Sequence, residues 1–438
     1  MPASIVKPRR ASGFGEYLPS DQIEFNRLLD IIRETYERYG FAPLDTPVLE
    51  LTEVLLAKGG GETEQQVYSF KREGSNNDFT MRYDLTVPFA RYVAEHEADL
   101  TFPFRRYQIG KVYRAERAQA GRFREFYQCD IDIAGSQSPI VDAEFPAIIN
   151  EIFTRFDFGE FTIRLNDRRV LNGFFEQVGL ADKSQQVLRI VDKMEKISRE
   201  ELVYELSTAG LTHEQTERVL EFTAISGSND EIIAQLRQLA NSEGFNEGID
   251  KLEALITALR AMQVPERRFK VDLKIVRGLD YYTGTVYETI LNDHPEIGSV
   301  CSGGRYDNLA GHYTKTSLPG VGISIGLTRL FYKLREIGVI QSSAQSPASV
   351  VVMPFGQEQY ASTIRAASLL RKAGVAVMLH TEPDKIKKKM AYADRMGFTY
   401  VILIGEKEDE AASLTLRNMQ TGENKLIAFD ELLAYISV

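Results

Sequence analysis

The sequence predicts an α/β fold with more than one domain, and three observations support this class. The chain has 438 residues, about three times the length of a typical domain. Short segments in which apolar and polar residues alternate occupy residues 79–135, as expected for an antiparallel sheet. After residue 347, strand-like and helix-like segments alternate, which is typical of an α/β layer with a parallel sheet.

The expected elements of the first part of the chain follow from periodicity. Apolar residues with helical spacing fill residues 21–39, and Gly40 ends that helix. Residues 180–262 are helical throughout, with three helix starts that have capping-box spacing. These starts are Ser198 with Glu201, Thr212 with Gln215, and Ser228 with Glu231. Strand alternation returns at residues 269–275, so an all-helical insertion interrupts one sheet.

A second part of the chain begins after a linker. Residues 341–347 contain Ser, Gln, Ala and Pro without periodicity, which predicts a connection between domains. The expected elements after it are a strand at 350–353, a helix at 357–372, a strand at 375–379, a helix at 384–396 and a strand at 400–404.

Composition and charge exclude several classes of protein. Hydrophobic residues make up 43% and charged residues 26%, the balance of an ordinary globular protein rather than a disordered or fibrous one. The longest apolar runs are far shorter than the roughly 18 to 20 residues that cross a bilayer. Residues 1–10 lack a secretory signal, so a cytoplasmic location is expected. The formal charge of -10 argues against a protein that coats nucleic acid but allows a local basic patch.

Disulfide and metal sites are not expected. The two cysteines, Cys129 and Cys301, are too few for a disulfide scaffold or a thiolate zinc site. No two of the five histidines lie four residues apart, so a helical metal motif is not present in the sequence.

Two expected strands, at 110–116 and 126–133, carry the most chemistry. In the first, Val112, Arg114 and Glu116 share one face because side chains alternate along a strand. In the second, one face is apolar, and the other carries Phe126, Gln128, Asp130 and Asp132. One face of this hairpin is therefore suited to binding a polar ligand.

Positive charge is concentrated on the same hairpin. Residues 105–125 include seven basic residues against two acidic ones. The basic residues are Arg105, Arg106, Lys111, Arg114, Arg117, Arg122 and Arg124. Arginine forks bind phosphate oxygens in pairs, and an aromatic ring such as Phe126 offers a stacking surface for a base. A solvated charged hairpin is the alternative, but the alternation of the strands favours a polyphosphate site.

Three further segments are rich in glycine, tyrosine or arginine. Residues 277–282 are Arg-Gly-Leu-Asp-Tyr-Tyr, residues 302–307 are Ser-Gly-Gly-Arg-Tyr-Asp, and residues 320–330 form a glycine-rich strand that leads into a helix with Arg329 near its start. Paired glycines let a backbone approach a ligand closely, and tyrosine hydroxyls can orient a polar substrate. Each segment alone is more often a turn or a helix-packing feature.

Together these segments resemble the histidyl-tRNA synthetase family of class II aminoacyl-tRNA synthetases. Arg114-Ala115-Glu116-Arg117 followed by Phe126-Tyr127-Gln128 is similar to the second class signature, and residues 326–330 are similar to the third. Residues 277–282 and 303–307 are similar to the two histidine-specific signatures. The resemblance covers nearly the whole chain, with the motifs in the family's order.

The resemblance implies an architecture. The expected fold is an α+β catalytic domain with a mainly antiparallel sheet of six to seven strands flanked by helices, a helical insertion, and a C-terminal α/β domain with a mostly parallel sheet. The implied boundaries are 1–175 and 265–338 for the catalytic domain, 176–264 for the insertion, 339–347 for the linker and 348–438 for an anticodon-binding domain. That domain has a short basic run, which fits RNA binding or equally a solvated helix face. The run is Lys385, Lys387, Lys388 and Lys389.

The resemblance also implies an activity, that of a histidine–tRNA ligase. The carboxylate of L-histidine would attack ATP to give histidyl-adenylate and pyrophosphate, and histidine would then pass to the 3′-terminal ribose of tRNA(His). Positioning and electrostatics suffice for this chemistry. ATP is then a substrate, Mg²⁺ is expected to be bound largely through the nucleotide, and the chain is expected to form a homodimer.

The family's nucleotide-binding residues map onto five positions. Arg114 would grip the α-phosphate of ATP, and Glu116 would accept from the adenine amino group. Phe126 would stack on adenine, and Arg122 and Arg329 would hold the outer phosphates. Each role suits the chemistry of its side chain.

The implied histidine site combines carboxylates, a hydroxyl, an amide and two phenols. The α-amino group would be bound by Asp84, Thr86, Gln128 and Asp132. Tyr282 and Tyr306 would meet the imidazole, selecting it by hydrogen bonds. Arg277, with Arg114, would be catalytic, because a guanidinium beside the histidine carboxylate and the α-phosphate stabilises charge at phosphorus in the transition state.

The chain departs from the family's pattern at three places. Ser12-Gly13-Phe14-Gly15-Glu16 stands where the family usually has Gly-Thr-Arg-Asp near the N-terminus. Thr328 stands where a glutamate commonly precedes the third-signature arginine, and Ser302 stands where a third glycine is frequent. Neither of the latter two removes a charged ATP ligand.

Two other functions compete with the ligase. One is a synthetase-like paralogue that binds histidine and regulates ATP phosphoribosyltransferase. Such paralogues typically lack the anticodon-binding domain and the ATP-binding arginines, whereas this chain retains Arg114, Arg277, Arg329 and about ninety residues after the linker. The other is a non-catalytic tRNA-binding protein, which would bind tRNA without turnover.

Overall fold

A computed structural model describes residues 6–57, 66–71, 74, 78–117, 121–194, 197–275, 282–307, 309–342 and 344–436. The chain divides into two compact units, Met1–Gly15 with Asp30–Val339 and Glu16–Leu29 with Ile340–Val438. The boundary between the units falls within helix α1 (Pro19–Arg38). The presence of α1 confirms the helix predicted at 21–39. Within the described ranges, no helix has both the length and the apolar character needed to cross a membrane.

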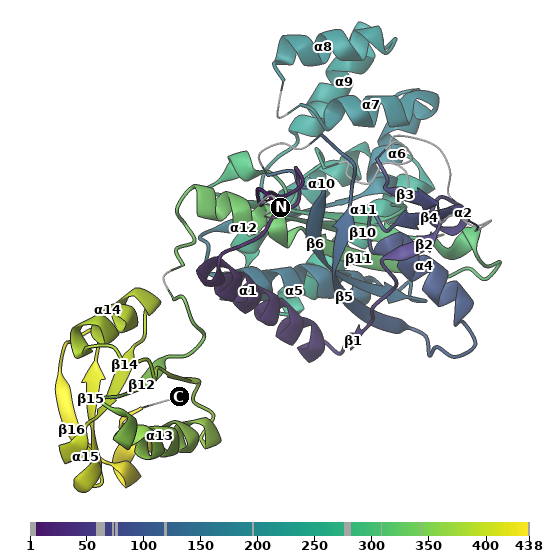
Figure 1. Cartoon of the computed structure of the whole chain (residues 1–438). Helices are drawn as coiled ribbons and strands as arrows, with labels where there is room; N and C mark the ends of the chain where they lie inside the picture. The colour runs from purple at the N-terminus through teal and green to yellow at the C-terminus, as the bar shows by residue number, and fades with distance from the viewer. Residues whose placement is uncertain are drawn as a thin grey trace. The chain divides into compact units, whose positions relative to one another are not determined.

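The larger unit is built around one eight-stranded sheet (Figure 1). Its spatial order is β1-β5-β6-β11-β10-β9-β7-β8. In that order the bounds are Ala42–Pro43, Phe104–Tyr113, Glu125–Ala134, Gly320–Ile325, Cys301–Tyr306, Thr285–Leu291, Phe161–Asp167 and Phe269–Val271. The outer pairs β1–β5 and β7–β8 are parallel, and the pairs between them are antiparallel. The mainly antiparallel sheet is confirmed, but the prediction of six to seven strands was too few; β1, with two residues, is too short to show a periodic pattern.

The hairpin that carries the basic residues differs in one respect from its prediction. β6 covers the predicted strand at 126–133, but β5 ends at Tyr113. Arg114 and Glu116 therefore lie in the connection to β6 rather than on a strand face. The Arg114 amide donates to the carbonyl of Arg124 at 2.9 Å, which closes the base of this connection.

A helix lies where the sequence predicted only strands. α4 (Thr86–Glu95) falls inside residues 79–135, and its apolar side buries Phe89 and Val93. The Asp84 carboxylate accepts from the Val87 amide at 3.1 Å, so the start of α4 fixes the positions of Asp84 and Thr86. The described residues between β1 and α4 include a small sheet of order β2-β4-β3 and the short helix α2. Their bounds are β2 Leu49–Leu51, α2 Thr52–Leu55, β3 Ser69–Lys71 and β4 Asp78–Met81.

Helix α5 (Pro139–Phe156) packs on the sheet mainly through buried apolar residues, and a buried polar network at its first turn adds to this contact. Asp142, in its first turn, is buried and forms an ion pair with Arg305 of β10. The Thr285 hydroxyl donates to the Asp142 carboxylate at 2.9 Å, and the Tyr287 hydroxyl donates to the Asp142 carbonyl at 2.9 Å. This network joins α5 to β9 and β10.

The predicted helical insertion is present between β7 and β8. Its helices are α6 Arg168–Gln177, α7 Ser184–Val191, α8 Arg199–Thr208, α9 His213–Ala224, α10 Asn229–Leu239 and α11 Glu243–Ala261. All three predicted capping boxes are confirmed, at Ser198, Thr212 and Ser228. The strand predicted at 269–275 is shorter than expected, because β8 ends at Val271, although the following Leu273 and Ile275 are also buried.

The second unit has a five-stranded sheet of order β13-β12-β14-β15-β16. Its elements are β12 Val350–Pro354, α13 Tyr360–Lys372, β13 Val377–Leu379, α14 Ile386–Met396, β14 Tyr400–Ile404, α15 Glu406–Glu410, β15 Ser413–Asn418, β16 Asn424–Ala428 and α16 Leu432–Tyr435. The predicted alternation of strands and helices is confirmed up to β14. The prediction of a mostly parallel sheet was wrong, because β14–β15 and β15–β16 are antiparallel.

Short 3-10 turns occur in both units. They lie at Ala181–Lys183, Glu266–Arg268, Pro295–Ile297, Leu309–His312, Gln357–Gln359 and Phe429–Glu431.

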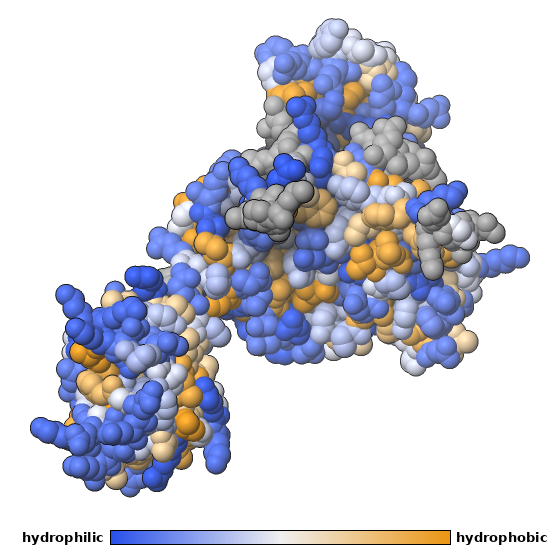
Figure 2. Space-filling view, viewed as in Figure 1, coloured by the Kyte–Doolittle hydropathy of each residue, from blue (hydrophilic) through white to orange (hydrophobic). Residues whose placement is uncertain are grey.

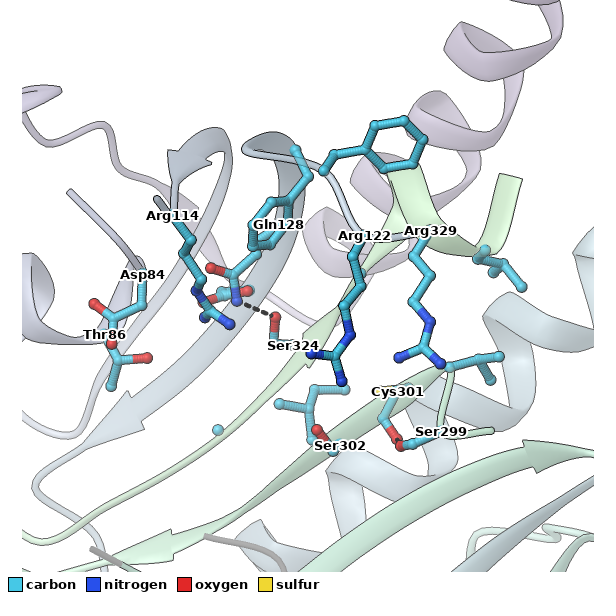
Figure 3. A pocket seen from close by; sticks show the side chains of 18 of the residues that line it. Asp84, Thr86, Arg114, Arg122, Gln128, Ser299, Cys301, Ser302, Ser324 and Arg329 are labelled. Atoms are coloured by element: carbon cyan, nitrogen blue, oxygen red, sulfur yellow. Dashed lines mark hydrogen bonds between the residues drawn. The ribbon is translucent and has the colours of Figure 1, made fainter. Parts of the chain in front are cut away.

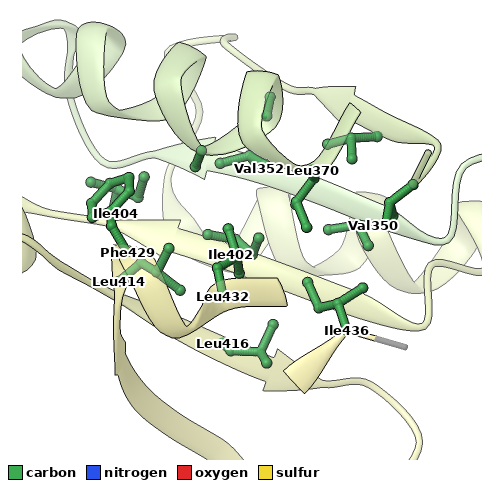
Figure 4. Close-up of a cluster of buried hydrophobic side chains, with 14 of the residues drawn as sticks. Val350, Val352, Leu370, Ile402, Ile404, Leu414, Leu416, Phe429, Leu432 and Ile436 are labelled. Atoms are coloured by element: carbon green, nitrogen blue, oxygen red, sulfur yellow. The ribbon is translucent and has the colours of Figure 1, made fainter. Parts of the chain in front are cut away.

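The core of the second unit lies between its sheet and α13 and α16. Val350 and Val352 of β12 and Ile402 of β14 contact Leu370 and Leu432 from these helices (Figure 4). The visible surface of the unit is mainly hydrophilic (Figure 2). This unit therefore has its own core.

One lysine of the predicted basic run is not available at the surface. Lys389 is buried, and its ammonium donates to the carbonyl of Pro354. Burial lowers the pKa of Lys389. Lys385, Lys387 and Lys388 are exposed.

Candidate active site

The central strands of the large sheet present a polar face. β6 carries Gln128, Asp130 and Asp132 on this face, and the register places Asp130 opposite Ser324 and Asp132 opposite Gly322 of β11. The alternate residues of β6 are fully buried in the core on the other face; they are Cys129, Ile131 and Ile133. The alternation of β6 predicted from the sequence is confirmed.

Glycines on the neighbouring strands leave room for these side chains. An ideal Cβ on Gly322 would lie 2.1 Å from Oδ1 of Asp132, and one on Gly320 would lie 2.2 Å from the ring of Tyr306. Both distances are shorter than any real contact, so β11 needs glycine at both positions. The glycines of β11 are thus explained by the close packing of Tyr306 and Asp132 against this strand.

These strands line a cavity of about 510 Å³. All predicted site residues within the described ranges line it: Asp84, Thr86, Arg114, Glu116, Arg122, Phe126, Gln128, Asp132, Tyr282, Tyr306 and Arg329. Arg277 lies outside the described residues, so its place is still a prediction. Figure 3 shows Arg122 and Arg329 side by side and pointing the same way, with Arg114, Asp84 and Thr86 on the other side of the cavity.

One end of the cavity is acidic. Asp84, Asp130 and Asp132 all line it, and the fully buried guanidinium of Arg106 forms an ion pair with Asp132 at 2.6 Å. Burial raises the pKa of Asp84 and of Asp132, and it raises the pKa of Asp130 to about 7. Arg106 opposes the shifts of all three. Arg106 balances only part of the negative charge of these three carboxyl groups. This end of the cavity is therefore suited to a ligand's cationic group.

Hydrogen bonds fix two of the side chains at this end. The Tyr306 hydroxyl donates to Oδ1 of Asp132 at 2.7 Å, and Nε2 of Gln128 donates to the Ser324 hydroxyl at 2.9 Å (Figure 3). Oε1 of Gln128 is buried and has no hydrogen-bond partner among the described residues. It is an acceptor available to a ligand.

The other end of the cavity is cationic. Arg329, the third residue of α12 (Leu327–Glu336), donates through Nη2 to the carbonyl of Ile297 at 2.7 Å. Nη1 of Arg122 lies 3.5 Å from Oε2 of Glu116. Across the cavity from these two, on the side of Asp84, Arg114 donates to the carbonyl of Tyr83 at 3.0 Å (Figure 3). These three guanidinium groups converge on one cavity, which suits a ligand with several negative charges.

An aromatic surface lies beside the arginines. The guanidinium carbon of Arg114 lies 5.2 Å from the centroid of the Phe126 ring, and both residues line the cavity. A planar base could stack on Phe126 while its phosphates reach the cationic end.

The seven basic residues of the hairpin do not act as one patch. Arg106 pairs with Asp132, Arg105 pairs with Glu144, and Lys111 pairs with Glu125 at 2.8 Å. Arg114 and Arg122 line the cavity. The prediction of a polyphosphate surface therefore included residues whose charge is balanced within the chain.

Sequence reasoning did not assign three residues of the site. Asp130 was predicted to lie on the polar face of β6, but no role was assigned to it. Ser324, which lies opposite Asp130 on β11, was likewise given no role. Arg106 was counted only as part of the basic cluster. The strand register that joins Arg106 to Asp132 could have shown its role, but register between strands cannot be read from periodicity alone.

The unusual Thr328 has a structural role. Its hydroxyl accepts from the Tyr127 amide at 2.8 Å, which ties the first turn of α12 to β6. The helix that carries Arg329 is thereby anchored to the strand that carries Phe126 and Gln128.

Comparison with known proteins places both units in described families. Residues 13–330 match the family described as Histidyl-tRNA synthetase, and residues 349–438 match the Anticodon binding domain. A histidine–tRNA ligase of Clostridium tetani is 51% identical over 440 residues, covering 100% of this chain and 99% of that protein. One of Xanthomonas oryzae is 46% identical over 463 residues, covering 99% of this chain and 98% of that protein.

Solved structures agree with the sequence comparison. A histidyl-tRNA synthetase from Nostoc sp. matches with a TM-score of 0.93 and 40% identity, over 99% of this chain and 100% of that chain. A Bacillus halodurans protein titled as an ATP phosphoribosyltransferase regulatory subunit/histidyl-tRNA synthetase matches with a TM-score of 0.74 and 22% identity, over 92% and 99%. At that identity the second match shows a shared fold alone.

Proposed function

The chain belongs to the histidyl-tRNA synthetase family, and we propose that it joins L-histidine to tRNA(His) at the cavity described above. The observation that carries this proposal is one cavity with a carboxylate-rich end and three converging guanidinium groups. An amino acid's ammonium group suits the first end, and a nucleoside triphosphate suits the second.

In the first step, the histidine carboxylate attacks the α-phosphorus of ATP. A bond forms between a carboxylate oxygen and phosphorus, the bond from phosphorus to the α,β-bridging oxygen breaks, and pyrophosphate leaves with its electron pair. Arg114, and Arg277 by the family's pattern, would stabilise the charge that builds on the phosphoryl oxygens. The chain's main contribution is to align the two substrates.

Histidine would lie at the acidic end. Its ammonium group would be bound by Asp84, Thr86, Gln128 and Asp132. Oε1 of Gln128, which has no partner in the part of the chain that the structure describes, is an acceptor suited to that group. Tyr282 and Tyr306 would contact the imidazole, and a polar pocket of this kind rejects isosteres that lack the ring nitrogens.

ATP would lie toward the cationic end. Phe126 would stack on adenine, Glu116 would accept from its amino group, and Arg122 and Arg329 would hold the outer phosphates. Among the described residues no group of three or more His, Cys, Asp or Glu side chains could hold a metal ion. On the family's pattern, Mg²⁺ would be bound largely through the nucleotide phosphates.

In the second step, the 3′-terminal ribose hydroxyl of tRNA attacks the carbonyl carbon of histidyl-adenylate, and AMP leaves. The match of residues 349–438 to the anticodon-binding family supports tRNA as the acceptor. We propose the domain boundaries given above, a homodimer and a cytoplasmic location on the same family basis.

Histidine-dependent exchange of labelled pyrophosphate into ATP tests the first step. We expect exchange that requires histidine, and charging of tRNA(His) by the same preparation. Binding of histidine without exchange would favour the regulatory paralogue, and tRNA binding without either reaction would favour a non-catalytic tRNA-binding protein.

Arg277→Ala tests the predicted catalytic residue. We expect the exchange rate to fall by about a hundred- to a thousandfold, the usual effect of removing one donor that stabilises an oxyanion, with a smaller change in histidine binding. An unchanged exchange rate would remove Arg277 from the mechanism.

A further inference from the structure

The N-terminal segment at residues 12–15 contacts the connection between β5 and β6. The carbonyl of Gly13 accepts from the Arg124 amide at 2.8 Å, and the carbonyl of Ser12 accepts from Nη1 of Arg124 at 3.3 Å. The ring of Phe14 lies 6.3 Å from that of Tyr68. Residues 12–14, which lie in one of the segments that depart from the family's pattern, therefore contact the connection that carries Glu116 and Arg122.

The Arg124 side chain joins this segment to the loop itself. Its Nε donates to the carbonyl of Glu116 at 3.0 Å. Its own carbonyl accepts from the Arg114 amide at 2.9 Å. One guanidinium thus spans two backbone carbonyls from distant parts of the chain. A planar fork with several donors can do this, whereas a lysine ammonium is a single point on a flexible stem.

The backbone at Gly13 favours the same contact. Gly13 has a φ of +84, and an ideal Cβ there would lie 2.7 Å from Cγ of Arg124. Any side chain at this position would meet both backbone strain and the Arg124 stem. Glycine therefore lets the segment lie directly on Arg124.

The loop is also held from its other side. The ring of Phe123 packs edge-on against Tyr332 of α12 at 5.3 Å. Glu116 and Arg122, which precede Phe123 and Arg124 in the same connection, line the cavity, whereas Arg124 is not among its lining residues. Arg124 can thus act on the cavity only through the loop.

We propose that Arg124 is a positioning residue for the nucleotide: by tying residues 12–13 to the Glu116 carbonyl, it fixes the loop that presents Glu116 and Arg122 to ATP. This inference rests on the proposed function of the cavity. It assigns residues 12–13 to the support of nucleotide binding. Among the described residues, the hydrogen bonds of Arg124 reach no residue assigned to histidine, so the effect on ATP should be separable from any effect on histidine.

Pyrophosphate exchange with the full chain tests the proposal. Arg124→Lys keeps the charge but cannot span both carbonyls. We expect the KM for ATP to rise about tenfold, the effect of losing one hydrogen bond to a charged group. The preference for ATP over GTP should weaken, and the KM for histidine should stay within twofold. Arg199→Lys, at an exposed pair with Glu217, is the matched control and should change neither KM.

Gly13→Ala gives a second variant that leaves Arg124 intact. It should raise the KM for ATP in the same direction, because the added methyl group would collide with the Arg124 stem and displace residues 12–13 from it. An ATP KM within twofold of wild type in both variants, or equal rises for ATP and histidine, would overturn the proposal. Absence of exchange in the wild-type chain would instead overturn the proposed function.

Discussion

Asp130 lies between Gln128 and Asp132 on β6, and burial raises the pKa of its carboxyl to about 7. The folded chain binds this proton more tightly than the unfolded chain does. The free energy of unfolding therefore falls as pH rises from about 4 to about 7 on account of this group. Asp167, whose pKa burial raises to about 6, adds to the same trend.

Asp130→Asn should flatten this pH dependence. We expect the decline in the free energy of unfolding between pH 4 and pH 7 to shrink by about 2 to 4 kcal/mol, because the titrating group is removed. Urea unfolding at a series of pH values measures it, with the exposed Asp182→Asn as control. Parallel curves for Asp130→Asn and wild type would contradict the prediction.

Gly322 is expected to be needed for histidine binding. The methyl group in Gly322→Ala would collide with Oδ1 of Asp132 and with the carbonyl of Ile131. We expect the KM for histidine in pyrophosphate exchange to rise at least about tenfold, consistent with the usual cost of overpacking, while the KM for ATP stays within twofold. Gly244→Ala is the matched control, because an ideal Cβ there meets no atom within 4 Å. An unchanged histidine KM would mean that β11 can move aside.

At the scale of elements, the buried pair between Asp142 and Arg305 joins α5 to β10. Asp142→Ala would leave the Arg305 guanidinium buried without its counter-charge. We expect a loss of about 3 to 5 kcal/mol in the free energy of unfolding, measured with urea. Glu217→Ala breaks an exposed pair with Arg199 and should cost less than about 1 kcal/mol. Similar losses in the two variants would show that the buried pair does not hold α5 in place.

Elements with strong local signals were predictable from the sequence. The capping boxes at Ser198, Thr212 and Ser228 were found because their hydrogen bonds join residues only three apart. β6 was found because one of its faces is apolar. β1 was missed because its two residues are too few for a pattern, whereas β8 was predicted from its alternation but with too late an end. α4 was taken for strand because its neighbourhood is dominated by β4, β5 and β6.

The identities of the residues that line the candidate site were predictable, because the motifs depend on residue type. Motif resemblance selected the lining residues, and the cavity brings together all of those that the structure describes. The pairing of Arg106 with Asp132 was not predictable, since it depends on which residues of β5 and β6 lie opposite each other. The contact between Gly13 and Arg124 was missed for a similar reason, because more than a hundred residues separate them in the chain.

At the scale of the whole molecule, the two units are expected to serve different steps. Replacing the exposed Lys385, Lys387 and Lys388 with glutamine removes three positive charges from the second unit. We expect weaker tRNA binding with a smaller dependence on salt, because fewer counterions are released. Pyrophosphate exchange, which does not need tRNA, should be unchanged.

Glutamine replacements at Lys7, Lys71 and Lys251 provide the control, since they remove the same charge from the larger unit. Charging of tRNA(His) at several salt concentrations measures the effect. Equal charging by wild type and the Lys385, Lys387 and Lys388 variant would show that this helix face is only solvated. A parallel loss of exchange would show that the change acts on the larger unit instead.

The order of strands in the large sheet has a consequence for synthesis on the ribosome. β6 ends at Ala134, but its neighbour β11 begins only at Gly320. At about 5 to 20 residues per second, roughly 10 to 40 s pass between them. During that interval the nascent polypeptide exposes an unpaired strand edge next to three carboxyl groups. The yield of folded protein would then depend on a chaperone that shields this edge until translation has passed Ile325.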